Sequence, residues 1–214
     1  MPVCSRCRKR QAKRSCPALR ANICPVCCAQ ERMIELACPE SCQYLRDARE
    51  QAVERQGQFQ AKELEPGEAA VLARMGSDER LIPLLHAIDQ AIVTVQREKL
   101  RDLQDAEALA ALENAVQNLE TESSGLIYEH RTGSPRVQIV SEAIRSQLEE
   151  IAGHEMFKVR PTRSEVMGAL KLARFRVLVH VRRAERDPRS SRAFVRQAAL
   201  FYPWPEEATM PLIV

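Results

Sequence analysis

The cysteines constrain this chain more than any other feature, because all eight fall within the first 42 of its 214 residues. The first two form a Cys-x2-Cys pair. A second such pair is followed directly by another cysteine, and the last two form a Cys-x3-Cys pair. Residues 1–42 hold few large aliphatic side chains, and so poor a segment needs a metal or disulfides to fold. The cysteines are Cys4, Cys7, Cys16, Cys24, Cys27, Cys28, Cys38 and Cys42.

Clustered cysteines have three common uses: disulfides, iron–sulfur clusters and zinc sites. Disulfides require an oxidising compartment, and the N-terminal residues are basic without the apolar stretch of a secretory signal. The Cys-x2-Cys-x2-Cys run of bacterial ferredoxins is missing, which weakens the iron–sulfur reading. A short Cys-x2-Cys turn directs two thiolates toward one tetrahedral Zn²⁺. The sequence therefore predicts zinc binding in a reducing cytoplasm.

Eight thiolates are enough for two zinc ions with four sulfur ligands each. Cys27 and Cys28 are adjacent, and in an extended chain their side chains point to opposite sides, so each can serve a different ion. Sites without an open position for water are structural rather than catalytic. We predict one site of Cys4, Cys7, Cys24 and Cys27 and another of Cys16, Cys28, Cys38 and Cys42, with a buried free thiol as the alternative for one of the eight.

Two runs of sequence carry a resemblance to known proteins. Ile-Cys-Pro-Val-Cys-Cys at 23–28 and Cys-Pro-Glu-Ser-Cys-Gln-Tyr-Leu at 38–45 resemble the cysteine-rich N-terminal module of a family of uncharacterised bacterial proteins. The layout is also similar to cross-braced, treble-clef zinc fingers of the HIT type, although their terminal histidine ligand is missing. The resemblance implies zinc and a helical body after the module, and it implies no chemistry.

From Pro39 onward the pattern is helical, with aromatics at only 4% of the composition. We expect a mostly α protein in which a small binuclear zinc-finger module (1–42) is followed by a connecting helix (43–66), an all-α helical bundle (67–202) and an extended tail (203–214). The connecting helix is expected to start near Pro39 and run toward Glu63.

Apolar residues at three- and four-residue steps predict the helices of the bundle. A Thr-x-x-Glu capping box at Thr162–Glu165 predicts the start of one of them, and Asp187-Pro188 its end. The stripe in 105–123 also has the spacing of a short coiled-coil seam, so a homodimer is the alternative to packing within the chain. The stripes are Leu81, Leu84, Leu85, Ile88, Ile92 and Val95; Leu109, Leu112, Val116 and Leu119; Val137, Val140, Ile144, Leu148 and Ile151; Val166, Leu170, Ala173, Val177 and Val181; and Phe194, Ala198 and Phe201.

The net charge of +3 conceals a strong division along the chain. Residues 43–150 are acidic, whereas 158–196 hold 12 Lys and Arg against three acids, and a basic run also occupies residues 6–14. Two roles are consistent with the basic segments. Either they neutralise the metal thiolates and the acidic middle segment, or they bind the phosphates of a nucleic acid. The first is favoured, because no aromatic residue in 1–43 can stack on a base.

No catalytic motif was found in the chain: it has no His-Glu-x-x-His, P-loop, Gly-x-Ser-x-Gly or Rossmann glycine pattern. Leu126–Arg131 is the one short segment that gathers Tyr, Glu, His and Arg, and a connector that plugs the bundle is its simpler reading. We therefore expect a non-enzymatic zinc protein whose helical domain binds a protein partner, with no membrane association. A nucleic-acid-associated protein is the alternative.

Overall fold

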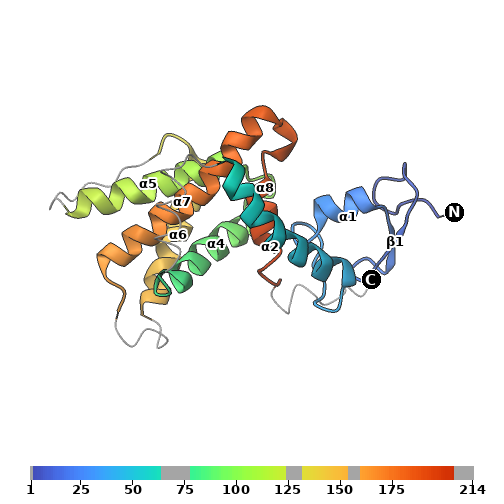
Figure 1. Ribbon diagram of the computed structural model, residues 1–214, viewed down its shortest axis with the longest axis horizontal. Helices are drawn as coiled ribbons and strands as arrows, with labels where there is room; N and C mark the ends of the chain where they lie inside the picture. Colours follow the sequence, from blue (N-terminus) through green and yellow to red (C-terminus); the bar gives the residue numbers. More distant parts are fainter. Residues whose placement is uncertain (1, 64–77, 124–131, 154–159, 205–214) are drawn as a thin grey trace. The chain divides into compact units, whose positions relative to one another are not determined.

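The computed structural model describes residues 2–63, 78–123, 132–153 and 160–204. Within these ranges the chain is mostly helical, and a two-stranded antiparallel sheet lies near its N-terminus (Figure 1). The residues form two compact units: Met1–Gly57 together with Arg196–Val214, and Gln58–Val195. The predicted mostly α class is confirmed, while the domain boundaries drawn from the sequence stay predictions.

The first unit begins with the cysteine-bearing elements. Strand β1 (Arg14–Cys16) pairs with β2 (Ala21–Ile23), with Cys16 opposite Ala21. Helix α1 (Pro25–Glu31) follows directly, and helix α2 (Gln43–Glu63) comes after an irregular stretch. Proline at the first position of α1 suits the helix, because that N–H has no partner within the helix.

Helix α2 begins later than the sequence predicted. We expected a start near Pro39, but the structure starts the helix at Gln43. The backbone carbonyl of Cys42 accepts hydrogen bonds from the N–H groups of Leu45 and Arg46, at 3.0 and 3.2 Å. Cys42 therefore lies at the helix boundary, where its backbone is fixed.

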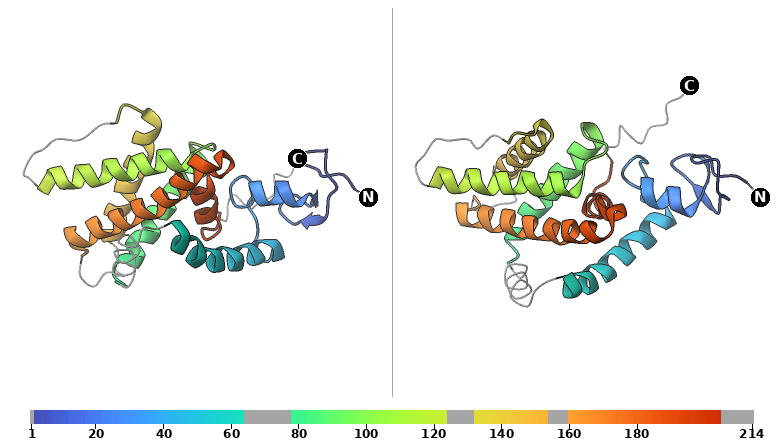
Figure 2. Two further views of the ribbon diagram at one scale, coloured as in Figure 1. Left: turned by 45° about the horizontal axis from the view of Figure 1, so that its top comes forward. Right: turned by 90° about the horizontal axis from the view of Figure 1, so that it is seen from above.

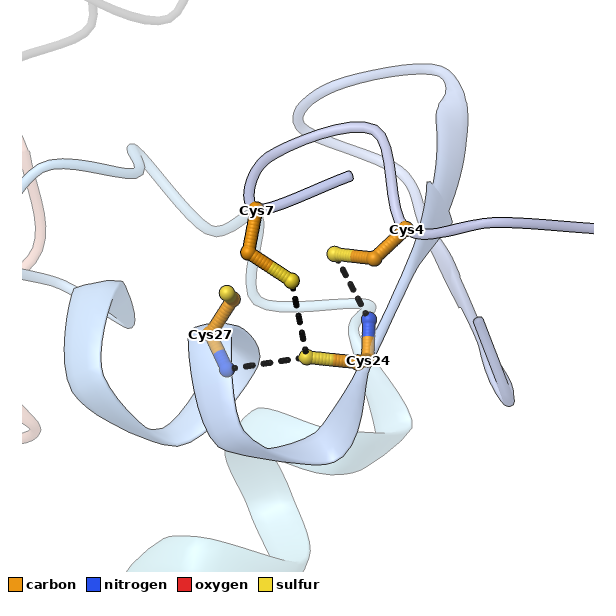
Figure 3. Close-up of side chains that lie close together, drawn as sticks. All are labelled: Cys4, Cys7, Cys24 and Cys27. Atoms are coloured by element: carbon orange, nitrogen blue, oxygen red, sulfur yellow. Dashed lines mark hydrogen bonds between the residues drawn. The ribbon is translucent and has the colours of Figure 1, made fainter. Parts of the chain in front are cut away.

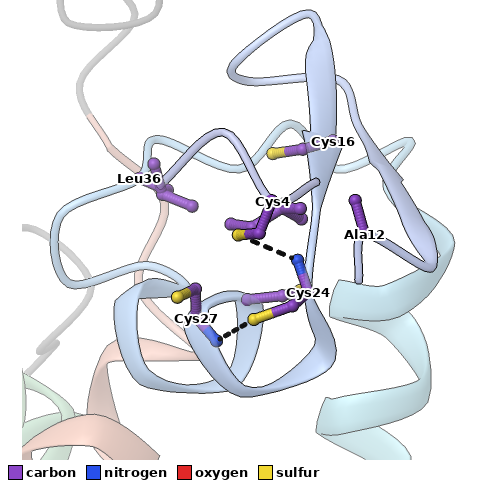
Figure 4. Close-up of a cluster of buried hydrophobic side chains, with 8 residues drawn as sticks. Cys4, Ala12, Cys16, Cys24, Cys27 and Leu36 are labelled. Carbon is purple, nitrogen blue, oxygen red and sulfur yellow. Dashed lines mark hydrogen bonds between the residues drawn. The ribbon is translucent and has the colours of Figure 1, made fainter. Parts of the chain in front are cut away.

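Sulfur supplies most of the interior of the N-terminal module. Five of the eight residues in its buried cluster are cysteines, and most of the cluster is labelled in Figure 4. Ala12, Ile23 and Leu36 complete the cluster, and Met33 and Ile34 are, apart from cysteine, the other buried apolar residues in the described part of the module. Its aliphatic core is therefore much smaller than that of an ordinary domain.

Four long helices make up most of the second unit: α4 (Leu81–Glu98), α5 (Asp105–Ser123), α6 (Pro135–Ala152) and α7 (Arg163–Arg186). Both α5 and α4 pack against α6 and α7, and the two views of Figure 2 show these helices side by side. None of the described helices combines the length and apolar composition needed to span a membrane.

The ends of these helices follow their sequence signals. Thr162 and Glu165 form the predicted capping box at the start of α7, and Gly153 caps the end of α6. Asp187 ends α7, as predicted, and a 3-10 turn (Pro188–Ser190) leads to the short helix α8 (Ala193–Ala199). The segment 126–131 and the tail beyond Trp204 lie outside the described residues.

The predicted apolar stripe of α4 is buried except at Leu85, whereas that of α5 is buried only in part. In α4, Leu84, Ile88 and Ile92 are fully buried. In α5, Leu112 is fully buried, whereas Leu109, Val116 and Leu119 are half-buried and Ala108 and Ala111 take the innermost positions. Small alanine side chains allow neighbouring helices to approach closely, and a search for large apolar residues overlooks them.

Ion pairs connect the basic helix α7 to the acidic middle of the chain. Four cationic side chains of α7 contact carboxylates of α4 and α5, and Arg80 of the segment before α4 contacts Glu165. The four pairs are Arg163–Glu122, Lys171–Glu120, Arg174–Glu113 and Arg176–Asp89, at 3.6, 3.1, 3.0 and 2.9 Å. This contact pattern matches the intramolecular reading of the charge division.

Candidate metal centre

Four cysteines converge at one point of the N-terminal module. The sulfur atoms of Cys4, Cys7, Cys24 and Cys27 all lie within 4.8 Å of one another. A tetrahedral zinc with Zn–S bonds of about 2.3 Å requires sulfur atoms about 3.8 Å apart. The Cys7 and Cys24 sulfurs are 4.0 Å apart, close to that spacing (Figure 3). We call this group the first quartet.

The first two ligands come from a tight turn before β1. An isolated bridge between Val3 and Gln11 closes the turn, and the Arg8 N–H donates to the Cys4 carbonyl at 2.9 Å. Arg8 has a φ of 52°, in the left-handed region that favours glycine. This conformation reverses the chain directly after Cys7, so that the N–H groups of Lys9 and Arg10 face the Cys7 sulfur.

The other two ligands come from the start of α1. Cys24 is the N-cap residue of this helix, and its sulfur accepts a hydrogen bond from the Cys27 N–H at 3.4 Å. The Cys24 N–H in turn donates to the Cys4 sulfur at 3.2 Å, which links the helix start to the turn. The Cys-x2-Cys spacing at 24–27 thus forms a helical cap and also brings together two candidate ligands.

Backbone hydrogen bonds set the acidity of the turn thiols. Burial opposes ionisation of Cys4, but N–H groups of Cys7, Cys24 and Arg6 outweigh it and lower the pKa of this thiol to about 6. N–H groups of Lys9 and Arg10 lower the pKa of Cys7 as well. These two sulfurs are favoured as thiolates, which are the form that binds metal.

The Cys27 thiol is instead harder to ionise, because it is buried beside other thiols. Burial and the nearby Cys24 and Cys7 raise the pKa of the Cys27 thiol to about 12. Four thiolates this close repel one another unless a cation lies between them. A divalent metal ion supplies that charge and releases the remaining thiol protons.

The other four cysteines are not brought to ligand distance in the same way. Among the described residues, the first quartet is the one group of three or more His, Cys, Asp or Glu side chains with this convergence. Cys16, Cys28 and Cys42 are nevertheless buried, and Cys38 is half-buried. A second metal site of Cys16, Cys28, Cys38 and Cys42 stays a prediction.

One premise of that prediction is wrong, because Cys27 and Cys28 lie in helix α1 and not in extended chain. Successive side chains on a helix diverge by about 100° rather than pointing to opposite sides. The two sulfurs still leave the helix in different directions, as two separate sites require.

The helical unit contains a cavity of about 360 Å³ between α5, α6 and α7. Its floor is apolar and includes Ile144, Leu148 and Leu170. Its rim carries three arginines and three glutamates: Arg145, Arg160, Arg163, Glu122, Glu142 and Glu149. No sequence pattern predicts this cavity, because it depends on how three successive helices pack against one another.

A largely buried ion pair lies between α4 and α7. The Arg176 guanidinium donates to Asp89 Oδ2 at 2.9 Å, while Asp89 Oδ1 is buried without a hydrogen-bond partner. Burial raises the pKa of Asp89, and Arg176 opposes that shift. The nearby His180 ring contacts Phe194 edge-on, at 5.7 Å between ring centroids. Burial together with Arg176 and Arg183 lowers the pKa of His180 to about 4.

Comparisons with known proteins add no relative to this geometry. No family model, no curated protein and no solved structure matches the chain. The resemblance to HIT-type fingers therefore rests on the cysteine motifs alone, and the first quartet is the part of it that the structure supports.

Proposed function

We propose that the N-terminal module is a structural zinc finger, and that the helical unit is a bundle that binds a protein partner. The convergence of the first quartet carries the zinc part of the proposal. Thiolate ligands at this spacing suit Zn²⁺, and four of them leave no position for a reactive water. The proposed role is therefore non-enzymatic, in a reducing cytoplasm.

The metal test is elemental analysis of the full chain, purified without added metal. We expect zinc bound with the thiols reduced. A chain without metal, or with native disulfides between these cysteines, would contradict the proposal. Iron in place of zinc would also contradict the proposal and would indicate a redox role for the module.

The cavity of the helical unit supports the protein-binding part. Its floor is apolar, and its rim has equal numbers of arginines and glutamates. Such a site suits a protein segment in which an apolar residue is flanked by acidic and basic residues. A polyanion such as a nucleic acid would be repelled by the glutamates.

Site-specific photocrosslinking tests this surface. A photoreactive residue in place of Arg145, on the cavity rim, should capture a defined protein in cells. The same residue in place of Arg189, in the 3-10 turn outside the cavity, is the matched control. Equal capture from both positions, or none from the rim, would contradict a partner at the cavity.

Nucleic-acid association is the alternative, and it depends on the basic segments being available to phosphates. Several of their arginines have carboxylate partners, including Arg6 with Glu31 and Arg174 with Glu113. Retention of the protein on DNA or RNA at low ionic strength, lost as salt rises, would favour this alternative. No retention at low salt would remove it.

A further inference from the structure

The turn that contains Cys16 repeats the backbone geometry of the turn that contains Cys4. In both, the N–H groups two and three residues after the cysteine face its sulfur: Arg6 and Cys7 for Cys4, Ala18 and Leu19 for Cys16. In both, the arginine four residues on is left-handed, with φ 52° at Arg8 and 50° at Arg20. N–H groups directed at sulfur stabilise a metal thiolate.

The repeat differs at one position. Leu19 stands where the first turn has its second ligand, Cys7, so the second turn offers one sulfur only. Three further ligands must then come from elsewhere in the module. Cys28 on α1 and the pair Cys38 and Cys42 before α2 are the cysteines that remain once the first quartet is complete.

Two guanidinium groups converge on the sulfur of Cys28. Arg14 Nη1 donates to it at 3.4 Å and Arg32 Nη2 at 3.6 Å. The Arg14 guanidinium also lies 4.6 Å from the centroid of the Tyr44 ring, close to the start of α2. A neutral thiol has little need of two cationic donors, whereas a metal-bound thiolate carries the charge that they would neutralise.

The remaining cysteines lie close enough to one another for their charges to interact. Cys16 ends β1, two residues after Arg14, and Cys42 lies two residues before Tyr44. The Cys42 N–H donates to the Pro39 carbonyl at 2.9 Å, which closes the turn between Cys38 and Cys42. Cys16, Cys28 and Cys42 are 6–7% exposed, so all three sulfurs face the interior.

From this arrangement we infer that Cys16, Cys28, Cys38 and Cys42 bind a second Zn²⁺, whose charge is balanced by Arg14 and Arg32. The inference rests on the proposed structural role of the first quartet, and it adds a second site and the two arginines that serve it. The sites interleave along the chain, since Cys16 precedes Cys24 and Cys28 directly follows Cys27. Loss of either ion should therefore loosen both ends of the module.

Metal stoichiometry tests the second site. The full chain should hold two zinc ions, and Cys38→Ser and its first-quartet counterpart Cys7→Ser should hold one each. One zinc in the parent chain, retained in Cys38→Ser, would overturn the second site and leave the first intact. No zinc in the parent chain would overturn the proposed function itself.

Either serine variant could fail to fold, so a measurement on the unmutated chain decides such a case. Titration of the metal-free protein with Co²⁺ should build thiolate-to-cobalt absorption up to two equivalents. An end point at one equivalent would overturn the inference even if both variants precipitate.

The role of Arg14 has its own readout. Arg14→Gln should speed the release of one of the two zinc ions to a chelator by about tenfold and leave the other unchanged. Lys13→Gln, which removes a charge from the preceding exposed residue, is the control and should change neither rate. Equal rates of zinc release from Arg14→Gln and Lys13→Gln would show that Arg14 does not stabilise the site.

Discussion

Single residues of this protein hold conformations that their side chains do not favour. Arg8 is left-handed although a β-carbon disfavours that region by about 1–2 kcal/mol. The adjacent Cys7 explains why the conformation persists, because the reversal at Arg8 directs the N–H groups of Lys9 and Arg10 at the Cys7 sulfur.

Arg8→Gly should therefore raise the free energy of unfolding of the metal-loaded module by roughly 1 kcal/mol or less, since glycine also gains entropy in the unfolded chain. Denaturation of the full chain, followed by metal release, measures the effect. Lys9→Gly is the control, because Lys9 is exposed and does not have a positive φ. A stabilisation by Lys9→Gly as large as that by Arg8→Gly would refute the strain argument.

His180 makes the stability of the helical unit depend on pH. Its folded pKa of about 4 lies below the ordinary value of 6.5, so the unfolded state takes up its proton first. This histidine should cost no stability above pH 7, and its unfavourable effect should grow as pH falls from about 6.5 to 4, by at most about 1.4 kcal/mol per pH unit.

Urea denaturation between pH 7 and pH 5 measures this dependence. His180→Phe removes the titrating group and should flatten the profile, beyond any change it causes at pH 7. An unchanged pH slope in His180→Phe would assign the dependence to other groups.

At the scale of elements, contacts distant in sequence decide where α8 begins. Asp105, at the start of α5, is buried and accepts hydrogen bonds from the N–H groups of Phe194 and Val195, at 2.9 and 3.1 Å. These are N–H groups of the first turn of α8, which have no partner within the helix. One carboxylate thus caps a helix about 90 residues away.

Asp105→Ala should lower the free energy of unfolding of the helical unit by about 2–3 kcal/mol, because two buried N–H groups lose their acceptor. Thermal unfolding followed by far-UV circular dichroism measures the loss. Asp102→Ala, at an exposed carboxylate three residues earlier, is the matched control and should have a much smaller effect. Similar losses in Asp105→Ala and Asp102→Ala would argue against the capping role.

Helix boundaries marked by local capping signals were predicted correctly, whereas features that depend on packing were not. The capping box at Thr162 and the stop at Asp187 were predicted correctly, because both signals act within one helical turn. The start of α2 was misplaced, since proline tolerates a first turn without requiring one. The inner face of α5 was also misjudged, because alanine packing depends on the neighbouring helices.

At the scale of the whole molecule, the two compact units are stabilised by different chemistry. The helical unit buries aliphatic side chains such as Leu84, Ile88 and Val177, whereas the module buries mainly cysteine. Metal removal should therefore affect the two units unequally.

Cys24→Ser should lose the metal of the first quartet and destabilise residues 1–42, while the helical unit keeps its far-UV signal. Cys24 is chosen because serine can still cap α1, so the effect reports the loss of the expected ligand. Amide hydrogen exchange measured by mass spectrometry locates the loss of protection. If protection falls equally in the module and in α4–α7, the two units do not unfold independently.

The sequence by itself determined that the module depends on its cysteines and that the rest is helical. Both follow from local facts: the spacing of thiols, the shortage of aliphatic residues before Pro39, and apolar residues at helical steps. The spacing also led to the grouping of Cys4, Cys7, Cys24 and Cys27, whose sulfurs converge in the structure. Tertiary structure alone decided that Arg14 reaches the Cys28 sulfur and that Asp105 caps α8. Each of these pairs groups from separate elements, and no local pattern records how a chain brings such elements together.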